Sequence, residues 1–430
     1  MILSDSLDSP MYQANRTLKQ KLERLIYLSE ARVESLKLIL HNNSSISRVI
    51  NNQDIEPSLH HQYNHNLFLI QVGIGTFAHS PSYKTYYLVL DTAGGPIWTQ
   101  CEGCNPCFHQ RDPVFPKMQS NSYHEFTCDY CPPGTTCEYN HCAFDLTYGD
   151  GTYVHGIAAT ETFTFRPRNG GSPIPIWSLG YGCATHTQNF IPGMDKNNIV
   201  SGIFGMSPHP SSFMGQVGSH FGGRFSYCLA PIHHQRQLPP MFLRFGDDIP
   251  PLSSRHRHQT PFIRGRNPFY YLDLQSITVG SEKLNIKSSV FQLRQDGSGG
   301  CIIDSGSGAS LLITTAYIEF EKVLTRNIVA QNPRIRIDSR SPMLCYKESD
   351  VKVKFPKVTF HFANNADFVV EPELYMADYM KENSRVNCLM IRPSDKFTIL
   401  GAYQQVNHRI VYDTVNSELH FASANCFSDN

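Results

Sequence analysis

The stretch Tyr86-Tyr87-Leu88-Val89-Leu90-Asp91-Thr92-Ala93-Gly94-Gly95 carries an apolar, β-prone run into an aspartate and then into a turn that contains a hydroxyl residue and glycines. The same arrangement recurs far downstream at Cys301-Ile302-Ile303-Asp304-Ser305-Gly306-Ser307-Gly308. A single aspartate after a strand is more often a turn residue than a catalytic one. Its repetition in matching context instead predicts two similar halves, each of which contributes one carboxylate to a shared site.

The chemistry of two neighbouring carboxylates explains why such a pair would be built. Because like charges a few ångströms apart repel, one carboxyl keeps its proton while the other ionises. The pair can then activate a water molecule, with one oxygen as general base and the other as general acid, and it needs neither a metal nor a covalent intermediate. We therefore interpret Asp91 and Asp304 as catalytic, and we expect their turns to be supported by Thr92, Ala93, Ser305 and Gly306.

Further motifs accompany the two turns, and together they make the chain resemble the pepsin-like aspartic proteases, specifically the nepenthesin-like group of plants. The matching motifs run from about residue 66 to residue 426, so the resemblance covers nearly all of the chain beyond its N-terminal segment. They are Leu90-Asp91-Thr92 with Ile97-Trp98-Thr99-Gln100-Cys101, Tyr148-Gly149-Asp150-Gly151-Thr152-Tyr153 with Ala159-Thr160-Glu161-Thr162, Phe225-Ser226-Tyr227-Cys228-Leu229, and Ile399-Leu400-Gly401-Ala402-Tyr403-Gln404-Gln405 before Val411-Tyr412-Asp413.

The resemblance implies an all-β, bilobal pepsin-like fold with an active-site cleft between two duplicated lobes, plus an N-terminal helical prosegment. On that pattern residues 1–64 are the prosegment and linker, residues 65–262 the N-terminal lobe with the flap and a cysteine-rich insert, and residues 263–430 the C-terminal lobe. Tyr148 takes the place of the flap tyrosine. The implied activity is that of an aspartic endopeptidase, a hydrolase that cleaves protein or peptide substrates at acidic pH without a cofactor.

One departure from the family pattern lies at the first aspartate. The family has Asp-Thr-Gly-Ser there, whereas this chain has Ala93 and Gly94 after Thr92. We expect the Cβ of Ala93 to restrict the backbone φ angle and to crowd the carboxylate, and Gly94 supplies no hydroxyl. These changes predict a slow protease, whose turnover an Ala93→Gly substitution would raise with little change in fold stability.

Two other classes of function compete with the enzyme. A catalytically impaired binding or inhibitor protein on the same scaffold, similar to the plant xylanase-inhibitor proteins, would explain Ala93. We favour the enzyme because both aspartates are present, although a fold alone does not fix function. A cysteine-rich receptor ectodomain would leave the duplicated aspartates unexplained.

Thirteen cysteines indicate a disulfide framework that forms in an oxidising compartment, which favours a secreted or vacuolar protein. Taken alone, Cys101-x-x-Cys104-x-x-Cys107 is also typical of part of a zinc knuckle, but no histidine follows at finger spacing. Cys301 is left over, and we expect it to be a small buried hydrophobe rather than a reactive thiol. The resemblance implies the pairs Cys101–Cys104, Cys107–Cys183, Cys128–Cys142, Cys131–Cys137, Cys228–Cys426 and Cys345–Cys388.

The charge balance excludes several kinds of partner. Lysine plus arginine equals aspartate plus glutamate, at 37 each, so no global charge recruits nucleic acid or an anionic membrane. The 19 histidines are scattered and lack the spacing or acidic companions of a metal site, so we interpret them as solvated loop residues rather than ligands. No apolar run is long enough to span a membrane. We expect a monomer that binds neither metal, cofactor, nucleic acid nor membrane.

The N-terminal segment has its own pattern. Residues 1–20 lack the basic and apolar regions of a secretory signal; this conflicts with the cysteines, and we expect an incomplete N-terminus. Residues 17–40 have leucines at helical spacing and an excess of basic side chains, and a polar stretch follows at 42–57. This is typical of a prosegment, although an ordinary surface helix has the same features. We expect acid-triggered cleavage between residues 51 and 66, and glycan acceptors at Asn15, Asn42 and Asn43.

Short β-prone runs alternate with turn signals from about residue 66 onward, as an all-β body requires. We expect a strand at residues 68–75. Two apolar segments that end in glycine, residues 201–205 and 399–401, are predicted to lie against the two catalytic turns. Residues 317–324 are predicted to form a short helix behind the second turn.

Overall fold

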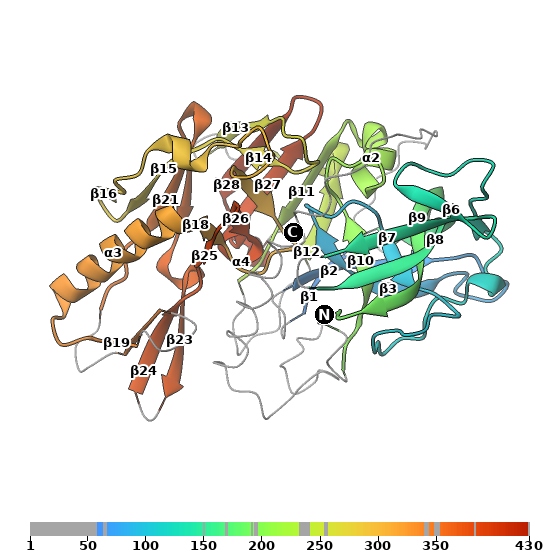
Figure 1. Ribbon diagram of the computed structural model, residues 1–430, viewed down its shortest axis with the longest axis horizontal. Helices are drawn as coiled ribbons and strands as arrows, with labels where there is room; N and C mark the ends of the chain where they lie inside the picture. The colour runs from blue at the N-terminus through green and yellow to red at the C-terminus, as the bar shows by residue number, and fades with distance from the viewer. Residues whose placement is uncertain are drawn as a thin grey trace.

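The computed structural model describes residues 58–62, 67–148, 151–167, 171–190, 192, 197–231, 241–252, 257–338, 344–347, 353–381 and 384–428. The helix predicted at residues 17–40, the polar stretch after it and the three glycan acceptors lie outside these residues. The described chain is built mainly of strands with few helices (Figure 1), so the all-β prediction is confirmed.

The first half of the chain forms a large sheet of apolar strands. The strand predicted at residues 68–75 is β2, which pairs antiparallel with β3, the strand that leads into Asp91. The hairpin of β8 and β9 extends this sheet through the contact of β8 with β2, and Phe163 and Phe165 of β8 lie in the core. The elements are β1 (Ser58–Gln62), β2 (Leu67–Ile74), β3 (Lys84–Asp91), β4 (Trp98–Gln100), β5 (His124–Glu125), β6 (Thr135–Glu138), β7 (His141–Thr147), β8 (Tyr153–Phe165), β9 (Ile174–Gln188), β10 (Val200–Gly205), α2 (Phe213–Val217), β11 (Arg224–Cys228) and β12 (Met241–Phe245).

The second half repeats the strand that ends in an aspartate and adds two four-stranded sheets. Its helix α3 is longer than the predicted residues 317–324, because buried side chains recur at helical spacing from Tyr317 through Leu324 to Ile328. The elements are β13 (His258–Ile263), β14 (Tyr271–Leu272), β15 (Leu274–Val279), β16 (Glu282–Lys283), β17 (Cys301–Asp304), β18 (Leu311–Ile313), α3 (Thr314–Gln331), β19 (Arg336–Asp338), β20 (Cys345–Lys347), β21 (Val358–Phe362), β22 (Ala366–Val370), β23 (Met376–Lys381), β24 (Ser384–Leu389), β25 (Arg392–Ser394), β26 (Thr398–Gly401), α4 (Ala402–Gln405), β27 (His408–Asp413) and β28 (Glu418–Ser423).

A six-stranded antiparallel sheet joins the two halves at the centre of the molecule (Figure 1). Its order is β1-β12-β11-β27-β28-β13, so each half contributes three strands. The middle contact pairs β11 with β27, where the rings of Phe225 and Tyr412 stack with centroids 4.3 Å apart. The disulfide Cys228–Cys426 closes the same contact covalently.

The structure corrects the disulfide pairs that the resemblance implied. Cys228–Cys426 and Cys345–Cys388 are present, and Cys301 is the unpaired, buried cysteine of the described residues. The other four predicted pairs are wrong. The first half contains instead Cys101–Cys183, Cys104–Cys107, Cys128–Cys137 and Cys131–Cys142.

Strand pairing explains the largest of these corrections. Strand β4 runs parallel to β9 with Thr99 opposite Cys183, so Cys101 follows with its Cα 5.5 Å from that of Cys183. Cys104 and Cys107 then close the next loop, with Cα atoms 5.6 Å apart. Because this register is a long-range property of the sheet, the resemblance, which rests on short motifs, did not reveal it.

Candidate active site

Both predicted aspartates lie at the carboxyl end of a strand that has a parallel neighbour. Strand β3 ends at Asp91, which lies opposite Gly205 of β10, and β17 ends at Asp304, which lies opposite Gly401 of β26. The predicted apolar-glycine segments are therefore confirmed beside the two turns. A Cβ on Gly205 would approach the Gly95 carbonyl oxygen to 2.1 Å, so only glycine allows the chains to pass this closely.

Reciprocal hydrogen bonds join the two turns. The Ser305 N–H donates to Thr92 Oγ1 at 2.9 Å, and the Thr92 N–H donates to Ser305 Oγ at 3.2 Å. Each hydroxyl then donates across to the other strand, Ser305 Oγ to the Leu90 carbonyl at 2.8 Å and Thr92 Oγ1 to the Ile303 carbonyl at 3.4 Å. All of these groups are buried, so the structure brings the two predicted half-sites together through the hydroxyl residues next to the aspartates.

The two carboxylates are held in similar ways. The Ala93 N–H donates to Asp91 Oδ1 at 2.9 Å, and the Gly306 N–H donates to Asp304 Oδ1 at 2.8 Å. One difference follows from the sequence: Ser307 Oγ donates to Asp304 Oδ2 at 2.7 Å, whereas the corresponding residue of the first turn is Gly94. A Cβ at Gly94 would lie 2.6 Å from Asp91 Oδ2, so this turn has no space for a serine without a shift of the carboxylate.

Ala93 fits the first turn. Its backbone is not in the left-handed region, so the methyl group requires no strained φ angle. The side chain is 1% exposed and packs in an apolar cluster with residues of the second half, including Phe269, Ile302 and Leu311. The alanine therefore keeps its N–H directed at Asp91 and adds a buried contact between the halves.

Aromatic side chains pack behind the turns. Tyr227 Oη donates to Gln405 Oε1 at 2.6 Å and lies 2.8 Å from Tyr412 Oη. Burial raises the pKa of Tyr412 well above its ordinary value, and nearby Tyr227 and Asp304 raise it further. Burial also raises the pKa of Tyr227. Both phenols therefore stay protonated in acid and act as neutral hydrogen-bonding groups.

Tyr148, the predicted flap tyrosine, directly follows β7 in the hairpin that leads to β8. Its N–H donates to the Thr152 carbonyl at 2.7 Å, and the tip residues 149–150 lie outside the described part of the chain. Trp98 Nε1 donates to Tyr148 Oη at 2.8 Å, so the tyrosine is tied to the strand that follows the first catalytic turn. The Trp98 ring also packs edge-on against Phe108 and Phe190.

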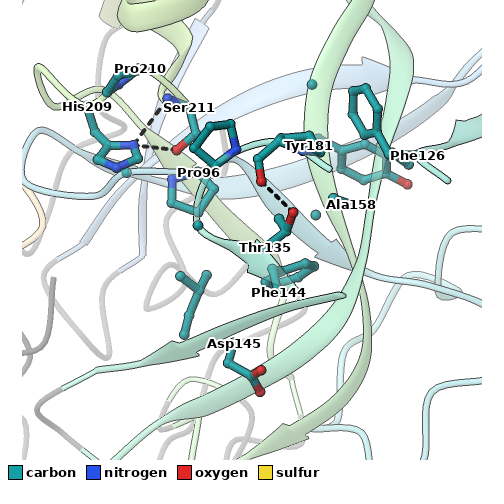
Figure 2. A pocket seen from close by; sticks show the side chains of 18 of the residues that line it. Pro96, Phe126, Thr135, Phe144, Asp145, Ala158, Tyr181, His209, Pro210 and Ser211 are labelled. Atoms are coloured by element: carbon teal, nitrogen blue, oxygen red, sulfur yellow. Dashed lines mark hydrogen bonds between the residues drawn. The ribbon is translucent and has the colours of Figure 1, made fainter. Parts of the chain in front are cut away.

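A cavity of about 210 Å³ lies beside the first catalytic turn (Figure 2). Gly95, Pro96 and Tyr148 line it near the turn, together with His209 and Ser211 from the loop that precedes α2. The cysteine-rich insert, residues 101–142, lines it from the other direction with residues 132–135.

The sequence interpretation missed three of these residues. Ser307 and Trp98 both lie within motifs quoted above. The Ser307 hydroxyl and the Trp98 indole N–H are hydrogen-bond donors that could have been predicted to reach the site. His209 has no signal in the sequence, because its place in the cavity depends on how segments that are remote from it in sequence fold together.

Within the described ranges, no group of three or more His, Cys, Asp or Glu side chains is arranged to hold a metal ion. No helix in that part of the chain has the length and apolar character needed to cross a membrane.

Family models and curated relatives of this chain point to the same family of plant proteins. Two family models match, "Xylanase inhibitor N-terminal" over residues 68–247 and "Xylanase inhibitor C-terminal" over residues 269–423. The chain is 31% identical to aspartic proteinase nepenthesin-2 of Nepenthes gracilis, over 96% of this chain and 87% of that protein. It is 30% identical to aspartyl protease family protein 2 of Arabidopsis thaliana, over 84% of this chain and 71% of that protein.

Solved structures share the fold at lower identity. The structure of edgp has a TM-score of 0.69 at 16% identity and covers 89% of this chain and 97% of its own. Basic 7S globulin from soybean has a TM-score of 0.66 at 18% identity and covers 88% and 98%.

Proposed function

This chain belongs to the nepenthesin-like family of plant aspartic proteases, and from that membership we propose that it is an aspartic endopeptidase that hydrolyses peptide bonds at acidic pH. The observation that carries the proposal is the reciprocal hydrogen bonding of Thr92 and Ser305, which holds Asp91 and Asp304 at the ends of two joined turns.

In the proposed reaction the two aspartates share one proton. The ionised carboxylate takes a proton from a water molecule that attacks the peptide carbonyl, and the protonated carboxyl gives its proton to the carbonyl oxygen. Thr92 and Ser305 hold the turns, and the main-chain N–H groups of Ala93 and Gly306 orient one oxygen of each carboxylate. Tyr148 closes over an extended peptide in a cleft between the two lobes.

The disulfides support a location of the protein in an oxidising compartment. Six disulfides form within the described residues, and such bonds persist in oxidising compartments. We propose a secreted or vacuolar monomer that is made as a zymogen, with the N-terminal segment removed in acid.

A second candidate is a protease-like binding protein that has lost catalysis. Gly94 favours it, because this turn lacks the hydroxyl that Ser307 supplies to the other aspartate. Against it stands Ala93, whose N–H reaches Asp91 at almost the distance that the Gly306 N–H has to Asp304.

Cleavage of denatured globin across the acid range, with and without pepstatin, tests the proposal. We expect a bell-shaped pH profile, because a dyad works while it holds one proton. Asp91→Asn and Asp304→Asn should each abolish cleavage, whereas Asp129→Asn, at an exposed carboxylate of the insert, should leave it unchanged. Pepstatin binding to a parent protein that cleaves nothing would favour the binding protein instead.

A further inference from the structure

A relay of buried side-chain hydrogen bonds crosses from the first catalytic turn to the second half of the molecule. It consists of the hydroxyls of Thr92, Tyr412 and Tyr227 and the amide of Gln405, and all four residues are fully buried. Tyr412 Oη lies 2.8 Å from Tyr227 Oη, which donates to Gln405 Oε1 at 2.6 Å. Thr92 is a hydrogen-bond neighbour of Tyr412. The two tyrosines belong to β27 and β11, the strands that join the halves at the centre of the molecule (Figure 1).

The far end of the relay reaches the strand beside Asp304. Gln405 Nε2 donates to the Leu400 carbonyl at 2.8 Å. Because a carbonyl only accepts, this bond fixes the amide with its oxygen toward Tyr227. Leu400 precedes Gly401, the residue of β26 that lies opposite Asp304. The relay therefore begins at the hydroxyl of one catalytic turn and ends at the backbone that supports the other.

Counting donors gives every bond of the relay a direction. A phenol has one proton, and Tyr227 directs its proton to Gln405, so Tyr412 must donate the bond between the two phenols. The Tyr412 oxygen can then only accept from Thr92. Burial raises the pKa of Tyr412 well above its ordinary value, whereas the bond from Thr92 acts in the opposite sense, as a donor to a phenol oxygen does. Thr92 can supply that proton, because its bond to the Ile303 carbonyl is long at 3.4 Å.

We propose that Tyr412, Tyr227 and Gln405 are positioning residues that hold the two catalytic turns against each other through Thr92. The inference rests on the proposed endopeptidase activity, because it assigns these residues a role in that reaction. Thr92 Oγ1 accepts the Ser305 N–H at 2.9 Å, one of the bonds that join the turns. A hydroxyl that donates to a phenol is a stronger acceptor, since hydrogen bonds in a series polarise one another.

A weaker joint between the turns would let the two carboxylates move apart. A displacement of about 1 Å can cost roughly a hundredfold in rate. Repulsion between two neighbouring carboxylates also separates the two steps in which they lose their protons. As the carboxylates move apart, the two steps approach each other and the bell-shaped pH profile narrows from both sides. A general loss of fold stability does not produce this symmetrical change.

The phenols act through hydrogen bonds rather than through charge. The titratable groups that face them, apart from each other, are Asp304 and Tyr270. Burial raises the pKa of Tyr270 well above its ordinary value, as it does for Tyr227 and Tyr412, so all three phenols are neutral in acid. The Tyr412 ring stacks on Phe225 with centroids 4.3 Å apart, a contact that a phenylalanine at position 412 would keep.

Tyr412→Phe therefore removes the hydroxyl alone. On a quenched peptide we expect kcat to fall about tenfold, KM to change by less than about twofold, and each limb of the pH profile to move inward by about half a pH unit. Tyr346→Phe is the matched control, because it removes another buried phenol hydroxyl, which lies 2.9 Å from that of Thr325 in α3. It should leave kcat and both limbs unchanged. A lower kcat in Tyr412→Phe without inward movement of the limbs would overturn the assignment.

Gln405 offers a rescue that tests the last bonds of the relay. A protonated glutamic acid has the shape of glutamine, and it can accept from Tyr227 with its carbonyl oxygen and donate to Leu400 with its hydroxyl. Burial keeps such a carboxyl protonated in acid. Gln405→Leu should lower kcat about tenfold at the optimum, whereas Gln405→Glu should stay within about twofold of the parent. Equal losses in the two variants would contradict the relay.

Amide hydrogen exchange at pH 7, followed by mass spectrometry of peptides that contain Ser305, separates the relay from the enzyme activity. If no variant cleaves but this amide exchanges faster in Tyr412→Phe than in Tyr346→Phe, the positioning role is supported and the endopeptidase is overturned. If Tyr412→Phe cleaves with the kcat and pH profile of the parent, the positioning role is overturned and the endopeptidase stands. Equal exchange in the two variants would overturn the positioning role in a protein of either kind.

Discussion

We expect the substitution His408→Gln to remove much of the acid sensitivity of the fold. His408 begins β27, is 4% exposed, and stacks on Phe368 with ring centroids 4.1 Å apart. Its Nδ1 lies 3.1 Å from the Val406 carbonyl oxygen. Burial lowers the pKa of His408 from 6.5 to about 4, because an imidazolium ion is poorly solvated at this position.

The effect on stability follows from these two pKa values. Well above pH 6.5 the imidazole is neutral in the folded and the unfolded chain, so its titration does not affect stability. As pH falls from 6.5 to about 4, the unfolded chain takes up a proton that the folded chain does not, and the free energy of unfolding decreases. Because one pKa unit corresponds to about 1.4 kcal/mol, the loss reaches about 3 kcal/mol at the acid end of this range.

Urea unfolding at pH 7 and pH 4 measures this loss, with the disulfides intact and Asp304→Asn present to prevent self-digestion. We expect the decrease in free energy of unfolding between the two pH values to be smaller by about 3 kcal/mol in His408→Gln than in the parent. His124→Gln, at an exposed histidine of β5, is the matched control and should behave like the parent. Equal decreases in the parent and in His408→Gln would refute the reasoning, because they would mean that His408 is not the neutral buried group.

Three further results are expected. Ala93→Gly removes a buried methyl group, so it should lower the free energy of unfolding by about 1 kcal/mol in urea unfolding. Turnover, measured by progress curves with pepstatin titration, should change by less than about threefold. A large gain in turnover would instead mean that the methyl group crowds Asp91. Burial raises the pKa of the Cys301 thiol, so iodoacetamide should label Cys301 only after denaturation, and rapid labelling of the native protein would contradict its burial. Strand β1 pairs with both β2 and β12, so the mature chain should keep β1 and begin at residues 51–57, before Ser58. Mass spectrometry that places the mature N-terminus after Gln62 would show that the sheet does not need β1.

The repeated strand-aspartate-hydroxyl pattern was enough to predict that Asp91 and Asp304 belong to one site, because sequence symmetry implies a spatial pair. The apolar-glycine segments at residues 201–205 and 399–401 were predictable for the same reason. What the repeat did not show was how the two turns differ. The Ser307 hydroxyl donates to Asp304 within its own turn, whereas the packing of the Ala93 methyl against the second half depends on contacts across the junction.

The errors also have physical causes. Four disulfide pairs were wrong because the family resemblance that implied them does not fix which strands lie side by side in this chain, and the parallel register of β4 and β9 decides the partner of Cys101. Helix α3 was predicted too short, although Ile328 continues its buried face for a further turn. His209 shows the limit most clearly, since it becomes part of a cavity only through segments that are remote from it in sequence.

The central sheet sets an order of events during synthesis. Strand β11 can pair with β12 as soon as both emerge, but its other edge waits for β27, and Cys228 waits for Cys426, which follows 198 residues later. At about 5–20 residues per second, a ribosome needs roughly 10–40 seconds to make that stretch. During this interval the nascent first half exposes an unpaired strand edge and a reduced thiol, features that invite wrong pairing. A chain released before Cys426 would keep both exposed, so the segment around Cys426 completes the first half as much as the second.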